Sequence, residues 1–234
     1  MSDLGEAFAL AATLLMRLDP DLIEIVILSL RVSLSAVALA AAIGLPLGAA
    51  VALFHFPGRT LAVALLNAFM GLPPVVVGLL VYLMLSRAGP LGVLGLLFTP
   101  GAMIIAQCLL ITPIVAALTT QTVADLNEEY DEQLRSLGAG PLRRLGTLLW
   151  DGRASLLIAI LAGFGRAIAE VGAVMIVGGN INHATRVMTT AIALETSKGN
   201  LALALALGLI LVALALAVNL AAMALRDAAR PRHA

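Results

Sequence analysis

Charged residues are scarce in this chain of 234 residues, and their scarcity excludes most soluble folds. They make up 12% of the sequence, whereas a soluble domain carries about 25%. Hydrophobic residues make up 61%, and the mean hydropathy is +1.05. A soluble fold would have too few polar side chains to cover this apolar surface, so the composition indicates a protein embedded in lipid.

Cysteine and histidine are also rare, and the formal net charge is zero. Each of these features excludes a class of function. The single cysteine, Cys108, excludes an internal disulfide and a multi-cysteine metal site. The three histidines show no metal-ligand spacing, so we expect neither a metal nor a cofactor. The formal net charge is zero, which gives no sign of a nucleic-acid partner. The chain also lacks a GxxxxGK[ST] phosphate loop and any catalytic constellation, so we do not expect an enzyme.

Long apolar runs, by contrast, are abundant. A helix needs about 20 apolar residues to cross the hydrocarbon core, and several runs reach that length. They are Leu22–Phe54, Leu61–Ser86, Pro100–Val123, Ala154–Gly179 and Leu201–Leu225. Because the runs are apolar on all sides, they do not match the alternating pattern of a membrane β-barrel. The sequence therefore predicts an all-α integral membrane protein with about five transmembrane helices.

The N-terminal part of the chain predicts two further features. The run Leu22–Phe54 is too long for one perpendicular span, so it should tilt, project past the membrane or bend near Pro46. The ten residues Ala7–Met16 predict an interfacial helix. No basic residues precede them, so we do not expect a cleaved signal peptide. We therefore expect an N-terminal segment at 1–21, a transmembrane domain at 22–226 and a cytoplasmic tail at 227–234.

Basic residues outside the apolar runs are unevenly distributed between alternate loops. If the N-terminus lies outside, eight basic residues face the inside: Arg59, Arg135, Arg143, Arg144, Arg153, Arg226, Arg230 and Arg232. Only four then face the outside: Arg17, Arg87, Arg186 and Lys198. The positive-inside rule therefore predicts an N-out, C-in orientation in the cell membrane.

The loop at 124–153 is the most polar part of the chain and lies inside in this orientation. Asp125 or Asn127 is expected to cap a short helix whose first turns are acidic. Gly138 and the Gly-Pro pair that follows should end this helix and turn the chain. A second short helix is predicted at about Leu142–Trp150, so the loop should form a helix–turn–helix beneath the membrane.

Within this loop, Glu132–Gly138, with the sequence EQLRSLG, resembles the EAA loop of ATP-binding-cassette importer permeases. Gln133 and Leu134 replace the two alanines of that motif, and Trp150-Asp151 stands where Leu-Pro usually follows. In that family the short helix docks in a groove of the ATPase subunit. The residues that the resemblance implies in this coupling are Glu132, Leu134, Arg135, Leu137, Gly138, Pro141 and Arg143. An ordinary amphipathic surface helix is the alternative interpretation.

Two prolines interrupt the second apolar run, in the segment Gly71-Leu72-Pro73-Pro74. They remove backbone donors and free carbonyls one turn earlier, which is tolerated only where protein or a water-lined cavity satisfies those groups. Pro73 and Pro74 are therefore candidates for a translocation path or gate, with a packing kink as the alternative. This run, like Gly44–Gly48 in the first one, also resembles the molybdate- and sulfate-type permeases.

The fourth run carries two opposite charges, Arg166 and Glu170, four residues apart on one helix face. Each charge costs about 2.5–3.5 kcal/mol at the centre of a membrane helix, so the pair should face the protein interior or an aqueous path. We consider two roles, a structural ion pair and a gate in the translocation path. The same Arg-x-x-x-Glu-x-Gly pattern occurs in the oxyanion permeases that the chain resembles.

The stretch at 178–199 contains GGNI, TRVMTTAI and ETSKG, which resemble the tungstate-type permeases. Its hydroxyls and Arg186 are candidates for contact with an oxyanion or a binding protein, unless the loop only crosses the outer surface. The resemblance extends from about Leu22 to Leu225. It implies a type I, MetI-like importer permease for tungstate, with molybdate or sulfate as alternatives.

The same resemblance implies a set of partners. They are two cytoplasmic ATPase subunits, an extracytoplasmic oxyanion-binding protein and a second copy of the chain in a homodimer. The rival interpretation is an autonomous secondary carrier or channel, in which Arg166 and Glu170 form the ion pathway. Binding of an ATPase subunit distinguishes the two interpretations.

Overall fold

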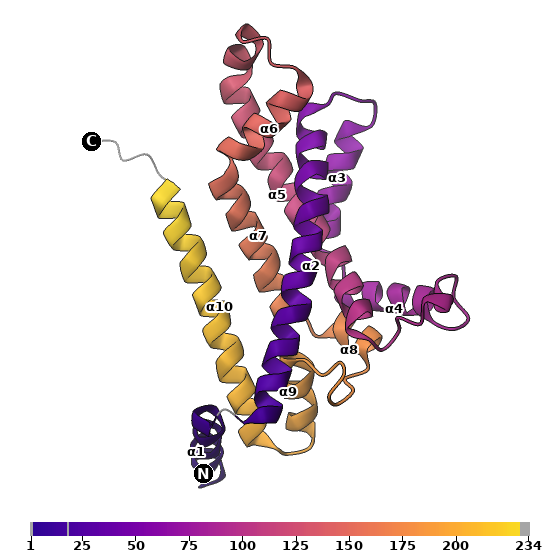
Figure 1. Cartoon of the computed structure of the whole chain (residues 1–234), viewed down its shortest axis with the longest axis vertical. Helices are drawn as coiled ribbons and strands as arrows, with labels where there is room; N and C mark the ends of the chain where they lie inside the picture. The colour runs from indigo at the N-terminus through magenta and orange to yellow at the C-terminus, as the bar shows by residue number, and fades with distance from the viewer. Residues whose placement is uncertain (1, 18, 230–234) are drawn as a thin grey trace. The chain divides into compact units, whose positions relative to one another are not determined.

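The computed structural model describes residues 2–17 and 19–229, and every regular element within these ranges is helical (Figure 1). The elements are α1 (Ser2–Arg17), α2 (Pro20–Leu53), α3 (Arg59–Met70), α4 (Pro74–Leu85), the 3₁₀ helix η1 (Gly92–Leu94), α5 (Pro100–Ser136), α6 (Pro141–Asp151), α7 (Arg153–Ile168), α8 (Gly172–Gly178), α9 (Met188–Ser197) and α10 (Leu201–Ala229). The all-α prediction is confirmed. Most of the tail predicted at 227–234 lies outside the described residues.

Single helices and bent pairs together account for the predicted spans. Among the described residues, α2, α5 and α10 are each long and apolar enough to cross a membrane. The bent pairs α3 with α4 and α6 with α7 raise the number to five if each pair is one span. The expected helix at Ala7–Met16 lies within α1. The prediction of about five spans agrees with the number obtained when each bent pair is counted as one span.

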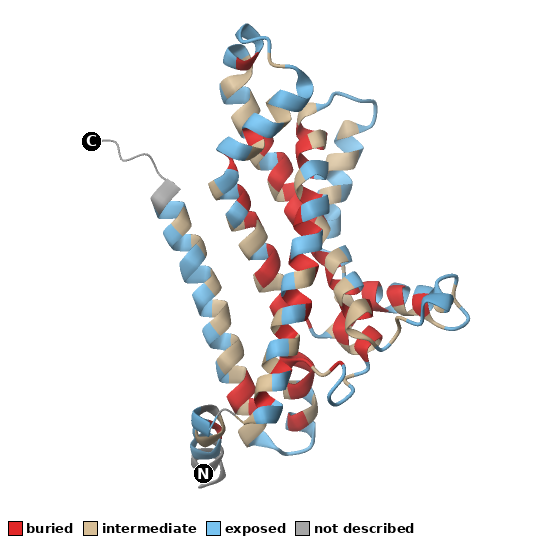
Figure 2. Cartoon of the chain, viewed as in Figure 1, coloured by how far each residue is buried: buried red, intermediate tan, exposed pale blue. Residues whose placement is uncertain are grey.

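The chain divides into two compact units that share its long helices. The first unit comprises Met1–Ala36, Pro73–Gln107 and Gly165–Ala217, and the second comprises Val37–Leu72, Cys108–Phe164 and Val218–Ala234. Figure 2 shows buried residues along one side of α2 and in α8 and α9, whereas α10 is mostly exposed beyond its first turns. A helix that exposes apolar side chains in this way suits a lipid or protein neighbour.

The second apolar run is a broken helix rather than one continuous span. Helix α3 ends at Met70, and α4 begins at Pro74. The cause is the proline pair, because Pro73 adopts an extended backbone and neither proline can donate a helical hydrogen bond. Pro74 then occupies the first position of α4, where a missing N–H costs nothing.

The fourth run, Ala154–Gly179, is also interrupted, which corrects the prediction of one uniform span. Helix α7 ends at Ile168, and α8 starts at Gly172. The first run differs from both, since α2 continues through Pro46 without a break. The sequence therefore placed the apolar segments and the break at the prolines, but it did not predict the break in the fourth run.

The acidic helix predicted in the 124–153 loop is not a separate element. Helix α5 runs without interruption from the third apolar run to Ser136, so neither Asp125 nor Asn127 caps a helix. No glycine or proline lies between Val123 and Ser136, and good helix formers dominate there, so nothing ends the helix. The second helix of the loop, α6, agrees with its prediction.

A second correction concerns the stretch at 178–199, which was predicted as a loop. It contains α9, whose first residues Met188, Thr189 and Thr190 are buried. The hydroxyl of Thr190 accepts a hydrogen bond from the Val187 N–H (3.2 Å), which caps the start of α9.

Gly48 lets α2 and α5 approach closely within the second unit. A Cβ atom at Gly48 would lie 2.3 Å from the carbonyl oxygen of Ala116 and 2.7 Å from Cβ of Thr119. The Thr120 hydroxyl donates a hydrogen bond across the same contact to the Gly48 carbonyl (3.0 Å). The two helices therefore pack with their backbones in contact at this position.

We predict that Gly48→Ala destabilises the chain by about 1–3 kcal/mol, because the two backbones must separate to admit the methyl group. Thermal unfolding in detergent measures this effect. Gly208→Ala in α10 is the matched control, since nothing lies within 4 Å of the added Cβ. It should leave the midpoint unchanged or raise it, so equal midpoints for the two variants would contradict the packing.

Candidate functional site

Helix α6 presents one apolar face to the protein and leaves another uncovered. Leu148 is fully buried, while the side chains of Leu142 and Trp150 are 81% and 69% exposed. Leu137, at the turn before α6, is 80% exposed. Large apolar side chains that stay exposed together on a short helix mark a surface suited to a partner.

The buried face of α6 rests on a hydrophobic cluster in the second unit. Its core members are Ala49, Ala52, Val123, Leu134 and Leu148, with partly buried side chains such as Leu126 and Leu145 around them. Leu134, one of the predicted coupling residues, therefore lies in the support beneath α6. The predicted residues Glu132, Arg135, Gly138, Pro141 and Arg143 are exposed.

The turn between α5 and α6 has the geometry predicted from its glycine and proline. Gly138 has φ of +65°, a conformation that glycine adopts without strain. The N–H of Ala139 donates to the Leu134 carbonyl (3.0 Å), and the N–H of Gly138 donates to the Arg135 carbonyl (3.0 Å). Pro141 then opens α6 at its first position. The turn thus fixes where α6 begins.

Asp131 connects the two helices of this turn through charged hydrogen bonds. Its carboxylate forms an ion pair with Arg135 (2.8 Å) on the same helix and with Arg144 on α6. Arg144 also donates a hydrogen bond to the amide oxygen of Asn127 (2.8 Å). The sequence analysis named neither Asp131 nor Arg144 as a site residue. Their pairing crosses the turn, and only the four-residue spacing of Asp131 and Arg135 was visible in the sequence.

A groove of about 650 Å³ lies beside this ion network, within the second unit. Arg59 lines it and donates hydrogen bonds to the carbonyl oxygens of Val51 (2.9 Å) and Ala52 (3.1 Å). A cation that satisfies free carbonyls at the end of α2 is favourable for the helix dipole. The base of the coupling loop is therefore fixed by polar contacts as well as by apolar packing.

We predict that Asp131→Ala loosens α6 without unfolding the chain, because it removes the carboxylate that Arg135 and Arg144 share. Hydrogen exchange should quicken at the α6 amides and stay unchanged in α2 and α10. Asp151→Ala is the matched control, because Asp151 is exposed and forms no ion pair among the described residues. Uniform quickening across the chain would contradict a local role for Asp131.

In the first unit, Arg166 and Glu170 form the ion pair that their spacing predicts. The Glu170 side chain is only 3% exposed, while that of Arg166 is 35% exposed. The carboxylate is thus withdrawn into the protein, and the guanidinium reaches its edge. A charged pair of this kind replaces water contacts that Glu170 has lost through burial.

The break between α7 and α8 is stabilised by side chains from several helices. The carboxylate of Glu170 accepts from the Ala173 N–H (3.1 Å), and its backbone carbonyl accepts from the Thr189 hydroxyl (2.7 Å). The side-chain amide of Gln107 donates to the carbonyl of Ala167 (3.0 Å), which also accepts from the Glu170 N–H (3.1 Å). Backbone groups released by a helix break in a membrane protein need such partners. Gln107 and Thr189 were not predicted as site residues, because they lie far from the break along the chain.

A small polar cavity of about 10 Å³ adjoins this break. Ser33, Gln107, Glu170 and Thr189 line it, and the buried amide oxygen of Gln107 has no hydrogen-bond partner among the described residues. The volume suits about one water molecule, which could donate to this oxygen. The interior beside the ion pair is therefore polar.

The structure also brings the proline break close to the charged one, within the first unit. A Cβ atom at Gly172 would lie 2.8 Å from Cγ2 of Val75, next to Pro74. Further along α4, a Cβ at Gly78 would meet the Cα of Ala173 at 2.7 Å. Of the predicted residues, Pro73 precedes α4 and Pro74 begins it. Helix α4 packs on α8, which starts two residues after Glu170.

The end of α9 carries a third charged group. Glu195 is buried, and its carboxylate accepts hydrogen bonds from Lys198 (3.0 Å) and Asn200 (3.0 Å). The Lys198 ammonium lowers the pKa of Glu195, against the opposing effect of burial. These contacts tie the segment before α10 to α9. Arg186, predicted as a possible oxyanion contact, is half-buried and precedes α9.

These features together define a class of protein. An all-helical chain with apolar spans, interrupted helices around a polar interior and an exposed amphipathic helix has the architecture of a membrane transport subunit. The chain belongs to the family of binding-protein-dependent transport system inner membrane components, whose model matches residues 44–233. It is therefore a multi-pass permease subunit of the inner membrane, and proteins of this kind move solutes rather than transform them.

Relatives from bacteria and archaea agree with this family. The chain is 44% identical to the tungstate uptake system permease protein TupB of Peptoclostridium acidaminophilum, over 86% of this chain and 88% of that protein. It is 42% identical to a probable anion ABC transporter permease protein of Haloferax volcanii, over 91% and 94%. It is 30% identical to the sulfate transport system permease protein CysW of Escherichia coli, over 75% and 63%.

Proposed function

We propose that this chain is the permease subunit of an ATP-binding-cassette importer for tungstate or a closely related oxyanion. The observation that carries the proposal is 44% identity to a tungstate permease over most of both chains. Sulfate and molybdate are tetrahedral dianions like tungstate, and a sulfate permease is 30% identical. The greater identity to the tungstate permease favours tungstate.

In this proposal α6 is the coupling helix. The exposed Leu137, Leu142 and Trp150 form the docking surface for an ATPase subunit, and Glu132 and Arg143 are exposed on the same loop. The cluster beneath Leu148 and the Asp131 network hold α6 firmly, so a push on its surface is transmitted to α5. This role requires the N-out, C-in orientation, which the distribution of basic residues supports.

Arg166 and Glu170, with Pro73 and Pro74, form the translocation path or its gate. The guanidinium of Arg166 reaches the edge of the protein and offers the positive charge that a dianion needs in a low-dielectric interior. The two helix breaks give this region backbone segments that can change direction. Alternating access follows if two nucleotide states of the ATPase favour two arrangements of these helices.

The partners in this proposal are two cytoplasmic ATPase subunits, an extracytoplasmic oxyanion-binding protein and a second copy of the chain. One feature supports a lipid or protein neighbour along α10. Large apolar side chains remain exposed there at spacings of three and four residues, namely Leu209, Val212, Leu216, Leu220 and Met223. Such a stripe meets either lipid or the second copy.

Uptake by cells that express the complete transport system tests this function. Tungsten accumulation, measured by elemental analysis, should require the chain and should fall only slightly in the presence of excess sulfate. If excess sulfate abolishes tungsten accumulation and sulfur uptake depends on the chain, the substrate is sulfate rather than tungstate. Tungsten uptake that continues without any ATPase subunit would favour the autonomous carrier instead.

A further inference from the structure

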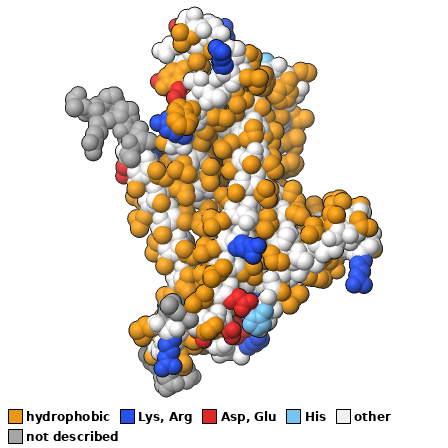
Figure 3. All heavy atoms as spheres, viewed as in Figure 1, with side chains coloured by type: hydrophobic (Ala, Val, Ile, Leu, Met, Phe, Trp, Pro, Cys, Tyr) orange, Lys and Arg blue, Asp and Glu red, His pale blue; other side chains and the backbone are white. Residues whose placement is uncertain are grey.

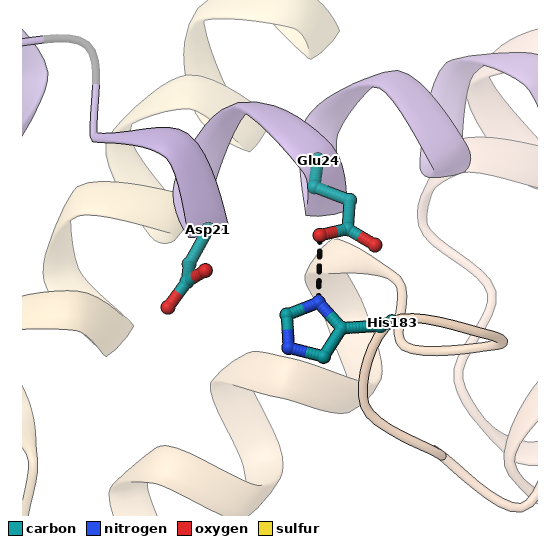
Figure 4. A group of neighbouring side chains, drawn as sticks. All are labelled: Asp21, Glu24 and His183. Atoms are coloured by element: carbon teal, nitrogen blue, oxygen red, sulfur yellow. Dashed lines mark hydrogen bonds and ion pairs between the residues drawn. The ribbon is translucent and has the colours of Figure 1, made fainter.

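Three side chains that can bind metals meet in the first unit, although they lie far apart in the sequence. Asp21 and Glu24 stand on the first turns of α2, three residues apart, and His183 lies in the segment between α8 and α9 (Figure 4). One ligand atom from each lies within 4.8 Å of the other two. The histidine spacing gave no sign of this group, because the fold alone brings the three together.

The three side chains lie on the same side of α2. Nδ1 of His183 lies 2.8 Å from a carboxylate oxygen of Glu24, and Figure 4 shows the Glu24 carboxylate directed towards the imidazole and the Asp21 carboxylate beside the ring. The side chains of His183 and Glu24 are 60% and 46% exposed, so an ion can enter from solvent. The carboxylate of Asp21 has no hydrogen bond or ion pair within the described residues, and it lines the same small cavity as Glu24 and His183.

The chemistry and spacing of these atoms suit a divalent transition metal. One imidazole nitrogen and two carboxylate oxygens are common Zn²⁺ ligands, with bonds of about 2.1 Å that place tetrahedral ligand atoms roughly 3.4 Å apart. Exposed carboxylates need only small rotations to close from 4.8 Å to that separation. We propose that Asp21, Glu24 and His183 form a binding site for a divalent transition-metal cation such as Zn²⁺, with water as the fourth ligand.

Charge on the surrounding residues sets the conditions for binding. The two carboxylates outnumber Arg186, the one cation that lines the same cavity among the described residues. The carboxylate of Glu24 raises the pKa of His183, so its imidazole keeps a proton to higher pH than usual. A metal must displace that proton, and binding should therefore strengthen as pH rises through the pKa of His183 and weaken as pH falls.

A bound metal would join the start of α2 to the segment between α8 and α9. The backbone of this segment has positive φ at Asn180 (51°) and His183 (56°), and Figure 4 shows the His183 imidazole next to α2. Among the described residues, the hydrogen bond between Glu24 and His183 joins these two segments through their side chains. Metal coordination would replace it with a link in which both segments bind the same ion.

Isothermal titration of the full chain in detergent with Zn²⁺ tests the proposal, after purification through a tag without histidine. The wild type should bind one Zn²⁺ per chain, more weakly at pH 6 than at pH 8. His183→Ala and Glu24→Gln should each lower the affinity at least tenfold, and Asp21→Asn should lower it less. His55→Ala and Asp151→Asn are matched controls, because both residues are exposed and lie outside the group.

The results separate a specific site from general surface binding. Visible absorption of bound Co²⁺ should appear in the wild type and vanish in His183→Ala, which reports the imidazole directly. Wild-type affinity in both His183→Ala and Glu24→Gln would overturn the proposal, as would the absence of saturable Zn²⁺ binding. Ca²⁺ that binds as tightly as Zn²⁺ would also overturn it, because imidazole is a poor Ca²⁺ ligand.

Discussion

Replacing Leu142 with glutamate is expected to separate the chain from its ATPase subunit and to lower tungstate uptake at least tenfold. The side chain is 81% exposed in the chain alone, so the charge should cost little folding free energy. In the complex the same position would be buried in a groove, where an unpaired carboxylate is costly. An apolar anchor of an interface contributes roughly 2 kcal/mol or more, which corresponds to about thirtyfold in affinity.

Co-purification of the ATPase and tungsten uptake by cells measure this effect. Val93→Glu is the matched control, because Val93 is 94% exposed and lies in η1, far along the chain from α6. The control should keep its ATPase and its uptake. If Leu142→Glu retains the ATPase as well as the control does, α6 is an ordinary surface helix and the coupling role is wrong.

Replacing Arg166 with alanine should produce the second large effect, a loss of about 3 kcal/mol in stability. Removal of one member of a buried pair costs about 3–5 kcal/mol, and the partly exposed guanidinium places this case at the lower end. The double variant Arg166→Ala with Glu170→Gln should recover most of the loss, because no buried charge remains. Glutamine also preserves an oxygen that can accept from the Ala173 N–H.

Transport by the double variant distinguishes a gate from a structural ion pair. Without the guanidinium the path loses its attraction for a dianion, so uptake should stay at least tenfold below wild type despite restored stability. Thermal unfolding and uptake measured on the same preparations give both values. A stable double variant with wild-type uptake would assign the pair to structure alone.

Strong local signals explain the parts of the fold that the sequence predicted. Gly138 and Pro141 set the end of α5 and the start of α6, because each restricts the backbone wherever it occurs. The apolar runs likewise located the spans through composition alone. These features depend on few neighbours, so one sequence is enough to predict them.

The remaining features depend on contacts between distant segments. Gln107 and Thr189 satisfy the backbone around Glu170, and nothing near them in the sequence indicates that role. Asp131 meets Arg144 only after the chain turns at Gly138. The interruption before Gly172 was also missed, because no proline marks it and the run is apolar on both sides.

Cross-linking from α6 tests the central claim most directly. Cys108 is the only cysteine, so Cys108→Ser provides a background for Leu142→Cys and, as a control, Val93→Cys. With a short photo-reactive cross-linker in intact membranes, Leu142→Cys should couple to the ATPase subunit, and ATP should change the yield. Val93→Cys should give no such product. Coupling of the ATPase to position 93 but not to position 142 would contradict both the orientation and the role of α6.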